Sequence, residues 1–326
     1  MRIVLSLAAL AVTLALPLTG SPAHAQNARS WVASFGSDGN PCTRAQPCAT
    51  FAHALSQTNA NGEINCVDQG DFGGLFITKS ITIDCEDVQA RLSASSGNVV
   101  VVVDAQPTDI VVLRGLDVSG TSAVQMDFGI DVDEPAIVRI EKCVVHDTNF
   151  GGIRIRSLNA SQTTEVSISD TVVVNNGISQ SGAGILITPQ AAGNVMKVVL
   201  NRVEARNNFF GIKVDGSQAS GGVVNLTIRD SVSSGNTANG IVATTPAAGP
   251  AIIMMIDRST SSHNAAGFGV IADGPKTTIR LGGSSIAGNI NGVGVSNGGV
   301  LQSYGTNQIN GNSNDGIAAL TPIGLH

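Results

Sequence analysis

The sequence predicts an all-β protein, a single-stranded right-handed parallel β-helix (a β-solenoid with three parallel sheets) with a short N-terminal capping helix. Two observations predict it. The chain has 38 glycines, many small and β-branched residues, and only 3% aromatic and 13% charged residues, a composition typical of short strands between many turns. One pattern also recurs: an alternating apolar strand, a polar step, a second strand, an asparagine, a Gly-Ile pair and a third strand.

Two other fold classes fit the sequence less well. An array of amphipathic helices is disfavoured by the alternation of apolar and polar residues, the β-branching and the frequent glycine. Disorder is disfavoured because 42% of the residues are hydrophobic, which is enough to bury a core.

Residues 1–25 have the pattern of a secretory signal peptide. Arg2 supplies an early positive charge, residues 3–18 are apolar, and Ala23 and Ala25 precede the expected cleavage position. A membrane anchor is the alternative, but Pro17 interrupts the apolar stretch. We expect a secreted or periplasmic protein without membrane insertion, since no later segment is long and apolar enough to span a bilayer.

Residues 26–61 are predicted to form an N-terminal cap, composed of a strand, a disulfide-closed turn and a capping helix. Thr50 is a suitable helix N-cap, and Phe51, Ala54 and Leu55 would form one apolar face. Such a helix would close the end of the solenoid, which otherwise exposes its core and unpaired strand edges. The β-helix itself is predicted over residues 62–326.

The five cysteines of an exported chain favour disulfides over thiolate chemistry. We predict a Cys42–Cys48 bridge across a proline-containing turn and a Cys66–Cys85 bridge between two successive strands, although spacing alone does not determine connectivity. Cys143 is left over and is expected to be a small buried side chain. No Cys/His spacing of the structural zinc type occurs, and no cofactor is predicted.

The repeat predicts where the coils stack. Ile168, Leu200, Ile228 and Ile256 share one phase and should form an internal column. Asparagine suits the following turn because it tolerates a left-handed backbone and its amide can bond the next asparagine in the stack. Glycine then lets the chain enter the next strand without a Cβ clash. The Gly-Ile copies and variants are Gly129-Ile130, Gly152-Ile153, Gly184-Ile185, Gly211-Ile212, Gly240-Ile241, Gly267-Phe268, Gly292-Val293 and Gly316-Ile317. The predicted asparagine ladder is Asn149, Asn207 or Asn208, Asn236, Asn264, Asn289 and Asn312, with an insertion after Asn175-Asn176 in one coil.

These residues resemble the right-handed parallel β-helix proteins of the pectin-lyase-like superfamily, whose coils commonly end in Asn-x-x-Gly-Ile. The resemblance covers roughly residues 62–319. It implies three parallel sheets, with the asparagine ladder at the turn between the second and third. The motif indicates a fold more strongly than an activity.

In enzymes of this superfamily, polysaccharide lyases and pectin hydrolases, the site lies on the outer face of the first sheet. An enzyme would be indicated by three or more carboxylates converging there with a lysine or arginine. Among the positions assigned to that face, the acidic ones are Glu141 and Asp257, several coils apart. Arg139, Glu141, Arg229 and Asp257 are therefore weak catalytic candidates. Calcium is expected only if the protein is a lyase, which would need it to neutralise a uronic acid.

Two further motifs have weaker chemical interpretations. His146 beside Asp147 could act as a general base, but a turn histidine bonded to its neighbour is favoured. Arg154-Ile155-Arg156 is similar to the Arg-x-Lys pair of the hydrolases, yet it is assigned to a different sheet.

The sequence favours a non-catalytic protein, either a structural or recognition module of the cell envelope or extracellular space or a weak binder of extracellular polysaccharide. A polysaccharide lyase or glycoside hydrolase is the first alternative. A trimeric adhesin or fibre is the second, because outward Ile253 and Met255 could form a subunit contact. Trp31 and Tyr304 are the only Trp and Tyr, so aromatic platforms for sugars are scarce. The net charge of -6 gives no basic surface for nucleic acid.

Overall fold

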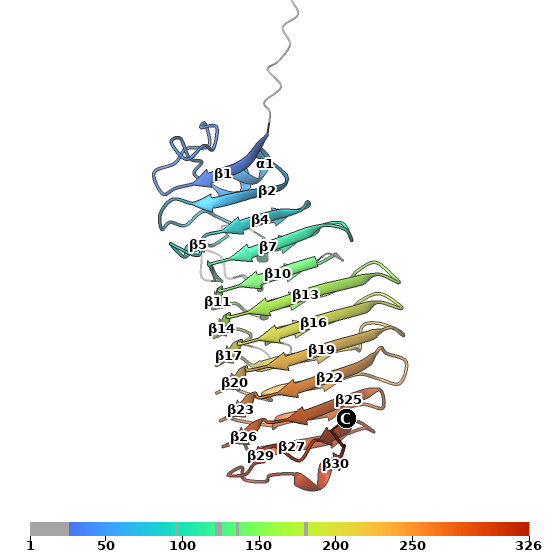
Figure 1. Cartoon of the computed structure of the whole chain (residues 1–326). Helices are drawn as coiled ribbons and strands as arrows, with labels where there is room; N and C mark the ends of the chain where they lie inside the picture. Colours follow the sequence, from blue (N-terminus) through green and yellow to red (C-terminus); the bar gives the residue numbers. More distant parts are fainter. Residues whose placement is uncertain (1–25, 95–96, 121–125, 135–136, 179–181, 326) are drawn as a thin grey trace, which may run out of the picture.

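A computed structural model of the chain describes residues 26–94, 97–120, 126–134, 137–178 and 182–325. The predicted signal peptide, residues 1–25, lies outside the described residues. The described chain forms an elongated stack of coils with three sheets (Figure 1). Strands of neighbouring coils pair in parallel in all three sheets. This confirms the predicted parallel β-solenoid.

Each coil contributes strands to the sheets in turn. In the described residues, the first sheet contains β1 (Asn27–Val32), β2 (Thr58–Cys66), β4 (Ile81–Asp84), β7 (Ile110–Arg114), β10 (Ile137–Glu141), β13 (Thr163–Ser169), β16 (Val195–Asn201), β19 (Val223–Arg229), β22 (Ala251–Asp257), β25 (Thr277–Gly282), β28 (Val300–Ser303) and β30 (Leu320–Pro322). The second contains β5 (Ala90–Leu92), β8 (Leu116–Ser119), β11 (Val144–His146), β14 (Val172–Val174), β17 (Glu204–Arg206), β20 (Val232–Ser234), β23 (Thr260–Ser262), β26 (Ser285–Ala287) and β29 (Gln308–Ile309). The third contains β3 (Leu75–Ile77), β6 (Val99–Val103), β9 (Phe128–Val132), β12 (Gly151–Ile155), β15 (Ala183–Ile187), β18 (Phe210–Asp215), β21 (Ile241–Thr244), β24 (Phe268–Asp273) and β27 (Asn291–Ser296). A 3-10 helix, η1 (Ile317–Ala319), precedes β30.

The core is a set of aliphatic columns inside the stack. In the first sheet, Ile168, Leu200, Ile228 and Ile256 are paired in register on successive strands and are fully buried. They form the column that the sequence predicts. The alternation of inward apolar and outward polar side chains along each strand is what fixes this register.

Helix α1 (Phe51–Gln57) lies beside β1 and β2 at the N-terminal end of the stack (Figure 1). The Thr50 hydroxyl accepts a hydrogen bond from the His53 backbone N–H at 3.1 Å, which caps the first turn. Phe51, Ala54 and Leu55 are buried, and the Phe51 ring meets the Phe72 ring edge-on at 5.4 Å. The helix thus buries the apolar face expected from its sequence.

The structure contains two disulfides, Cys42–Cys48 and Cys66–Cys85. The second joins the end of β2 to the residue after β4, so it links two adjacent coils. Cys143 is a free, buried cysteine, and burial raises the pKa of its thiol to about 12. A thiol protonated at every physiological pH is not a nucleophile.

A buried ladder of side-chain amides follows the second sheet along the stack. The Asn236 amide donates to Asn264 Oδ1 at 2.8 Å, and the backbone N–H of Asn208 donates to Asn236 Oδ1 at 3.0 Å. The same arrangement repeats from coil to coil, so each asparagine from Asn176 to Asn289 bonds the next rung of the ladder. The ladder residues are Asn176, Asn208, Asn236, Asn264, Asn289 and Asn312, with Thr148 before Asn176 and Asp315 after Asn312.

Of the predicted rungs, Asn149 is wrong, and of the two alternatives Asn207 and Asn208, the rung is Asn208. Asn207 is exposed and has φ of 52°, and the buried rung is the next residue, Asn208. Asn149 follows the rung position, which Thr148 occupies. The two properties that suit asparagine to this turn, a left-handed backbone and a stacking amide, belong to consecutive residues. The residue before each rung is Asp147, Asn175, Asn207, Gly235, His263, Gly288 or Gly311, all at positive φ.

The glycine of each Gly-Ile pair makes room for the ladder. A Cβ at Gly240 would lie 2.6 Å from Asn264 Nδ2 and 2.8 Å from the Gly269 carbonyl oxygen. Gly269, and not Gly267, is therefore the copy in that coil, and Val270 pairs with Ile241. The predicted pair Gly267-Phe268 is wrong because Gly267, at φ 72°, belongs to the preceding turn.

Candidate functional site

The outer face of the first sheet faces the viewer in Figure 1. The register of its strands places a continuous row of polar side chains at the ends of these strands. Residues of this row are paired in register on adjacent strands, about 4.8 Å apart. We call it the polar row. Its members are Asn65, Asp84, Arg114, Glu141, Ser169, Asn201, Arg229 and Asp257.

The predicted candidates occupy separate parts of this face. Glu141 and Arg229 belong to the polar row but have Ser169 and Asn201 between them. Arg229 and Asp257 are neighbours. Arg139 lies in the adjacent outward row, between Val112 and Ser167, and makes no ion pair with any described residue. The four residues therefore do not form one site.

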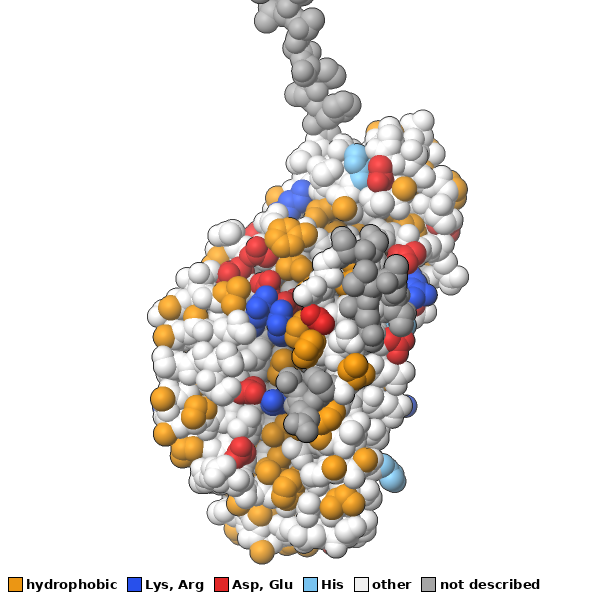
Figure 2. All heavy atoms as spheres, turned by 180° about the vertical axis from the view of Figure 1, so that it is seen from behind, with side chains coloured by type: hydrophobic (Ala, Val, Ile, Leu, Met, Phe, Trp, Pro, Cys, Tyr) orange, Lys and Arg blue, Asp and Glu red, His pale blue; other side chains and the backbone are white. Residues whose placement is uncertain are grey.

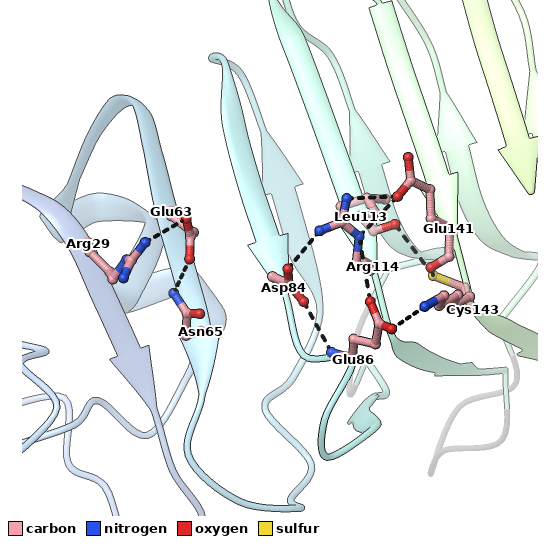
Figure 3. Close-up of polar contacts among 10 residues, drawn as sticks. Arg29, Glu63, Asn65, Asp84, Glu86, Leu113, Arg114, Glu141 and Cys143 are labelled. Atoms are coloured by element: carbon pink, nitrogen blue, oxygen red, sulfur yellow. Dashed lines mark hydrogen bonds and ion pairs between the residues drawn. The ribbon is translucent and has the colours of Figure 1, made fainter.

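The N-terminal part of the polar row holds an ionic cluster (Figure 3). The Arg114 guanidinium contacts Asp84 Oδ2 at 2.8 Å and Glu141 Oε2 at 2.8 and 2.9 Å, with Glu86 Oε2 at 3.9 Å. Lys142 contacts the other oxygen of Glu86. The hydrogen bonds with Glu141 and Asp84 raise the pKa of Arg114. We call these five residues the Arg114 cluster.

A cavity of about 290 Å³ lies beside the Arg114 cluster. Its lining is mainly polar and includes two cluster carboxylates together with Asp87 and Asn65, next to the Cys66–Cys85 disulfide. Three carboxylates, an arginine and a lysine thus converge beside a hollow on the first sheet. Three carboxylates with an arginine and a lysine on this face are the set of residues that would indicate an enzyme.

The contacts within the Arg114 cluster restrict its chemistry. Calcium requires several oxygen ligands, but Asp84, Glu86 and Glu141 already pair with Arg114 and Lys142. A base that removes a proton from a sugar must itself be deprotonated, and the raised pKa values of Arg114 and Lys142 oppose that. As arranged, these residues do not fit a calcium-dependent site.

Sequence reasoning missed Asp84, Glu86, Arg114 and Lys142. A usable signal was present, since the polar residue directly after the last inward aliphatic residue of each strand falls on the polar row. Ile83-Asp84, Leu113-Arg114 and Ile140-Glu141 share this pattern. Extending the alignment of coils two turns toward the N-terminus would have brought these residues together.

The C-terminal part of the first sheet has a pocket of about 330 Å³. Two predicted candidates, Arg229 and Asp257, line it together with the only tyrosine of the chain, Tyr304. We call it the Tyr304 pocket. Its other lining residues are Thr227, Met255, Gly282, Thr306 and Leu325.

Charged residues also stack at the turn between the first and second sheets. The backbone at these positions is left-handed, and the sign of the charge alternates from coil to coil. Arg202 contacts both carboxylate oxygens of Asp170, at 2.6 and 2.7 Å, and Arg258 contacts both of Asp230, at 2.9 Å. The hydrogen bonds lower the pKa of both aspartates. This turn ladder runs through Lys142, Asp170, Arg202, Asp230 and Arg258.

His146 lies between two carboxylates on the second sheet. Its Nε2 is 2.8 Å from Asp117 Oδ1 on the preceding coil, and its Nδ1 is 2.6 Å from Asp147 Oδ2. The hydrogen bond with Asp117, and secondly that with Asp147, raises the pKa of His146. With both nitrogens engaged, the imidazolium links two coils and is poorly placed to accept a substrate proton.

We predict that His146→Gln costs most stability at mildly acidic pH. A histidine whose folded pKa exceeds its unfolded value contributes stability that is fully present below the unfolded pKa, about 6.5, and lost as pH rises through the folded pKa. Urea unfolding of both proteins between pH 5.5 and 9 should show a difference that shrinks toward high pH. The exposed His263, replaced by Asn, is the control. A difference that grows with pH would contradict this assignment.

Arg154 lies in β12 of the third sheet and Arg156 directly follows that strand, so both lie off the first sheet, as expected from the sequence, and their guanidiniums are occupied. Both contact Asp131, which is 1% exposed, and Arg156 also contacts Asp133 at 2.5 Å. The Arg154 guanidinium lies 3.8 Å from the centre of the Phe128 ring. Figure 2 shows acidic and basic side chains gathered on the side of the molecule facing away from the view of Figure 1. Arginines held by Asp131 and Asp133 are not free to bind a substrate acid.

The outward apolar residues of β22 differ in exposure. Ile253 is 39% exposed, and Met255 is half-buried in the Tyr304 pocket. The described residues therefore leave Ile253 exposed and cover Met255 in part.

Comparisons with known proteins agree with the fold. No family model and no curated protein matches the chain. Among solved structures, pectate lyase Pel9A superposes with a TM-score of 0.57 and 15% identity, covering 85% of this chain and 74% of that one. A rhamnogalacturonan lyase gives a TM-score of 0.46 and 14% identity, covering 81% and 75%. Together with the three parallel sheets, the first likeness shows that the chain has the pectin-lyase-like parallel β-solenoid fold.

Proposed function

We propose that the protein binds an extracellular polysaccharide on the outer face of the first sheet and does not cleave it. The observation that carries this proposal is the polar row, with a pocket on the same face. An extended polymer can contact side chains from many coils at once, because each coil adds one position to the row. Polysaccharide-acting proteins with this fold, such as the pectate lyase above, make a carbohydrate ligand the natural choice.

Non-catalytic binding is supported by the ion pairs in which the charged side chains are already engaged. Each carboxylate of the Arg114 cluster is neutralised by a neighbouring arginine or lysine. His146 is likewise held by Asp117 and Asp147. Groups that satisfy one another in this way stabilise the stack, and they are poorly placed to exchange protons with a substrate.

We place the protein outside the cytoplasm, secreted or periplasmic. Two disulfides support this location, as does the signal-peptide pattern of residues 1–25. In the part of the chain that the structure describes, no helix is long and apolar enough to cross a membrane. Helix α1 and the Cys42–Cys48 turn would then cap a right-handed β-helix, protecting its first strands from edge-to-edge association.

Cleavage of polysaccharide is the second candidate function, because three carboxylates meet Arg114 and Lys142 beside a cavity. If these residues are structural, Arg114→Gln should lower stability by about 1 kcal/mol, since each pair is partly exposed. Arg139→Gln, which removes an arginine without an ion pair, is the matched control, and thermal unfolding measures both.

A glycan-binding and depolymerisation screen on the mature protein tests the proposal. We expect retention on at least one extracellular polysaccharide and no release of oligosaccharides, with or without added calcium. Product release that is lost in Glu141→Gln would establish the enzyme instead. Self-association through Ile253 and Met255 remains a prediction, and Ile253→Ser with a measured mass in solution tests it.

A further inference from the structure

The N-terminal cap brings three metal-ligating side chains together. The sulfur atoms of Cys42 and Cys48 and a ring nitrogen of His53 all lie within 4.8 Å of one another. Both cysteines are fully buried, and His53, which belongs to α1, is half-buried. Their spacing along the chain is not that of a structural zinc motif, and it is the packing of the turn against the helix that places them side by side. Two sulfurs and an imidazole nitrogen are ligands that Zn²⁺ prefers.

The imidazole of His53 is not engaged by the rest of the cap. The backbone N–H of His53 donates to the Thr50 hydroxyl, and its carbonyl accepts from the Ser56 hydroxyl. Within the part of the chain that the structure describes, no hydrogen bond or ion pair involves its ring. His53 also lines a cavity of about 370 Å³, together with Asp38 and Gln57. The ring is therefore available to a metal, and the cavity leaves room for water as a fourth ligand.

Hydrogen bonds hold the two cysteines in place independently of their disulfide. The Trp31 backbone N–H donates to the Cys42 carbonyl at 2.9 Å, and the Trp31 carbonyl accepts from the Cys48 N–H at 2.9 Å. The Asp38 carboxylate accepts from the Thr50 backbone N–H at 3.0 Å and from its hydroxyl at 2.9 Å, which ties the turn to the start of α1. Because none of these bonds needs the sulfur–sulfur bond, both cysteines should stay beside the helix when that bond opens.

We propose that the cap binds one Zn²⁺ ion through Cys42, Cys48 and His53 when its disulfide is reduced. A dithiol reductant opens the bridge: the reductant becomes a disulfide, and its two electrons and two protons pass to the sulfurs of Cys42 and Cys48. Zn²⁺ then displaces the two thiol protons and bonds both thiolates and the imidazole. This site is separate from the polar row, so the proposal is independent of polysaccharide binding.

The site gives the cap two ways to stay closed. Cysteines are reduced in every newly made chain, and disulfides form only in an oxidising compartment. A bound Zn²⁺ would join the turn to α1 in the reduced state, as the disulfide closes the turn in the oxidised state. Since a ligand that binds only the folded form stabilises it, the ion would protect the first strands before oxidation is complete.

Titration of the full chain with Co²⁺, a coloured substitute for Zn²⁺, tests the proposal. Protein reduced with a phosphine should bind one equivalent, with a thiolate-to-cobalt charge-transfer band that Zn²⁺ abolishes, and oxidised protein should show no such band. Cys48→Ser should lose the band. His53→Gln, which keeps both cysteines, should lose tight one-equivalent binding. Cys85→Ser, which removes the other disulfide, and His263→Gln, which removes an exposed histidine, are the controls and should bind as the wild type does. Circular dichroism checks that each variant is folded.

Thermal unfolding of the reduced protein gives a second measurement. Zn²⁺ should raise the melting temperature of the wild type and leave that of His53→Gln unchanged. A folded, reduced wild type without the charge-transfer band would overturn the proposal. The same band and affinity in His53→Gln would exclude the histidine as a ligand, and loss of the band in a folded Cys85→Ser protein would place the metal at the other cysteine pair. Either result would also overturn the site, and neither bears on the binding of polysaccharide.

Discussion

Ile228→Asp is expected to prevent the coil that contains it from folding. Ile228 is fully buried between Leu200 and Ile256 in the aliphatic column. A carboxylate at this position has no partner and would have to be buried uncharged or unpaired, which costs about 5 kcal/mol or more. Such a cost is comparable with the whole stability of many domains. We expect circular dichroism to show a large loss of strand structure at 25 °C.

Asn225→Asp is the matched control for this variant. Asn225 belongs to the same strand, is exposed, and pairs with Lys197 on the preceding coil. The same charge introduced there should change the free energy of unfolding by no more than about 0.5 kcal/mol. An Ile228→Asp protein that melts at the wild-type temperature would show that the inward assignment of this column is wrong.

Asn236→Ala is expected to have the second largest effect. The sequence alone suggests a loss on the order of 1 kcal/mol, as for one turn hydrogen bond. In the structure the Asn236 side chain donates to Asn264 Oδ1 and Ser233 Oγ and accepts from the backbone of Asn208. Its removal leaves partners on both neighbouring coils unpaired in a buried site, so we expect about 3 kcal/mol. Urea unfolding at pH 7 measures the difference.

Asn207→Ala separates the ladder from the turn. Asn207 precedes a rung, has a left-handed backbone and is exposed. Alanine there should cost about 1 kcal/mol, mainly through backbone strain. If Asn207→Ala and Asn236→Ala lowered the free energy of unfolding by the same amount, the stacked amides would contribute nothing beyond the conformation of the turn.

The repeat pattern was sufficient to predict the solenoid and its inward column. Strand alternation has a period of two, so a single correct phase places every side chain of a strand on its face. The ladder was harder, because pairs such as Asn207-Asn208 offer two equivalent residues. Only the geometry shows that the first takes the left-handed backbone and the second the buried position.

The charged sites could be predicted only in part from the sequence. Arg229 and Asp257 were assigned to the outer face, and the register places them side by side. Tyr304 was not connected with them, since it follows β28 and reaches the pocket only because Gly282 leaves space. This contact depends on the absence of a side chain at Gly282 in a neighbouring coil. The alternation of residues within one strand cannot predict such a contact.

The alternation of sign in the turn ladder restricts how this protein can change its length. Removing residues 170–201 would delete one rung, Asp170, and bring Lys142 directly against Arg202. Removing residues 170–229 would delete two rungs and bring Lys142 against Asp230, an attractive pair. Since like charges at neighbouring positions repel, coils in this segment are gained or lost with least cost in pairs. The charges of the turn ladder therefore favour changes of the repeat number by an even number of coils, although the side chains that carry them lie outside the core.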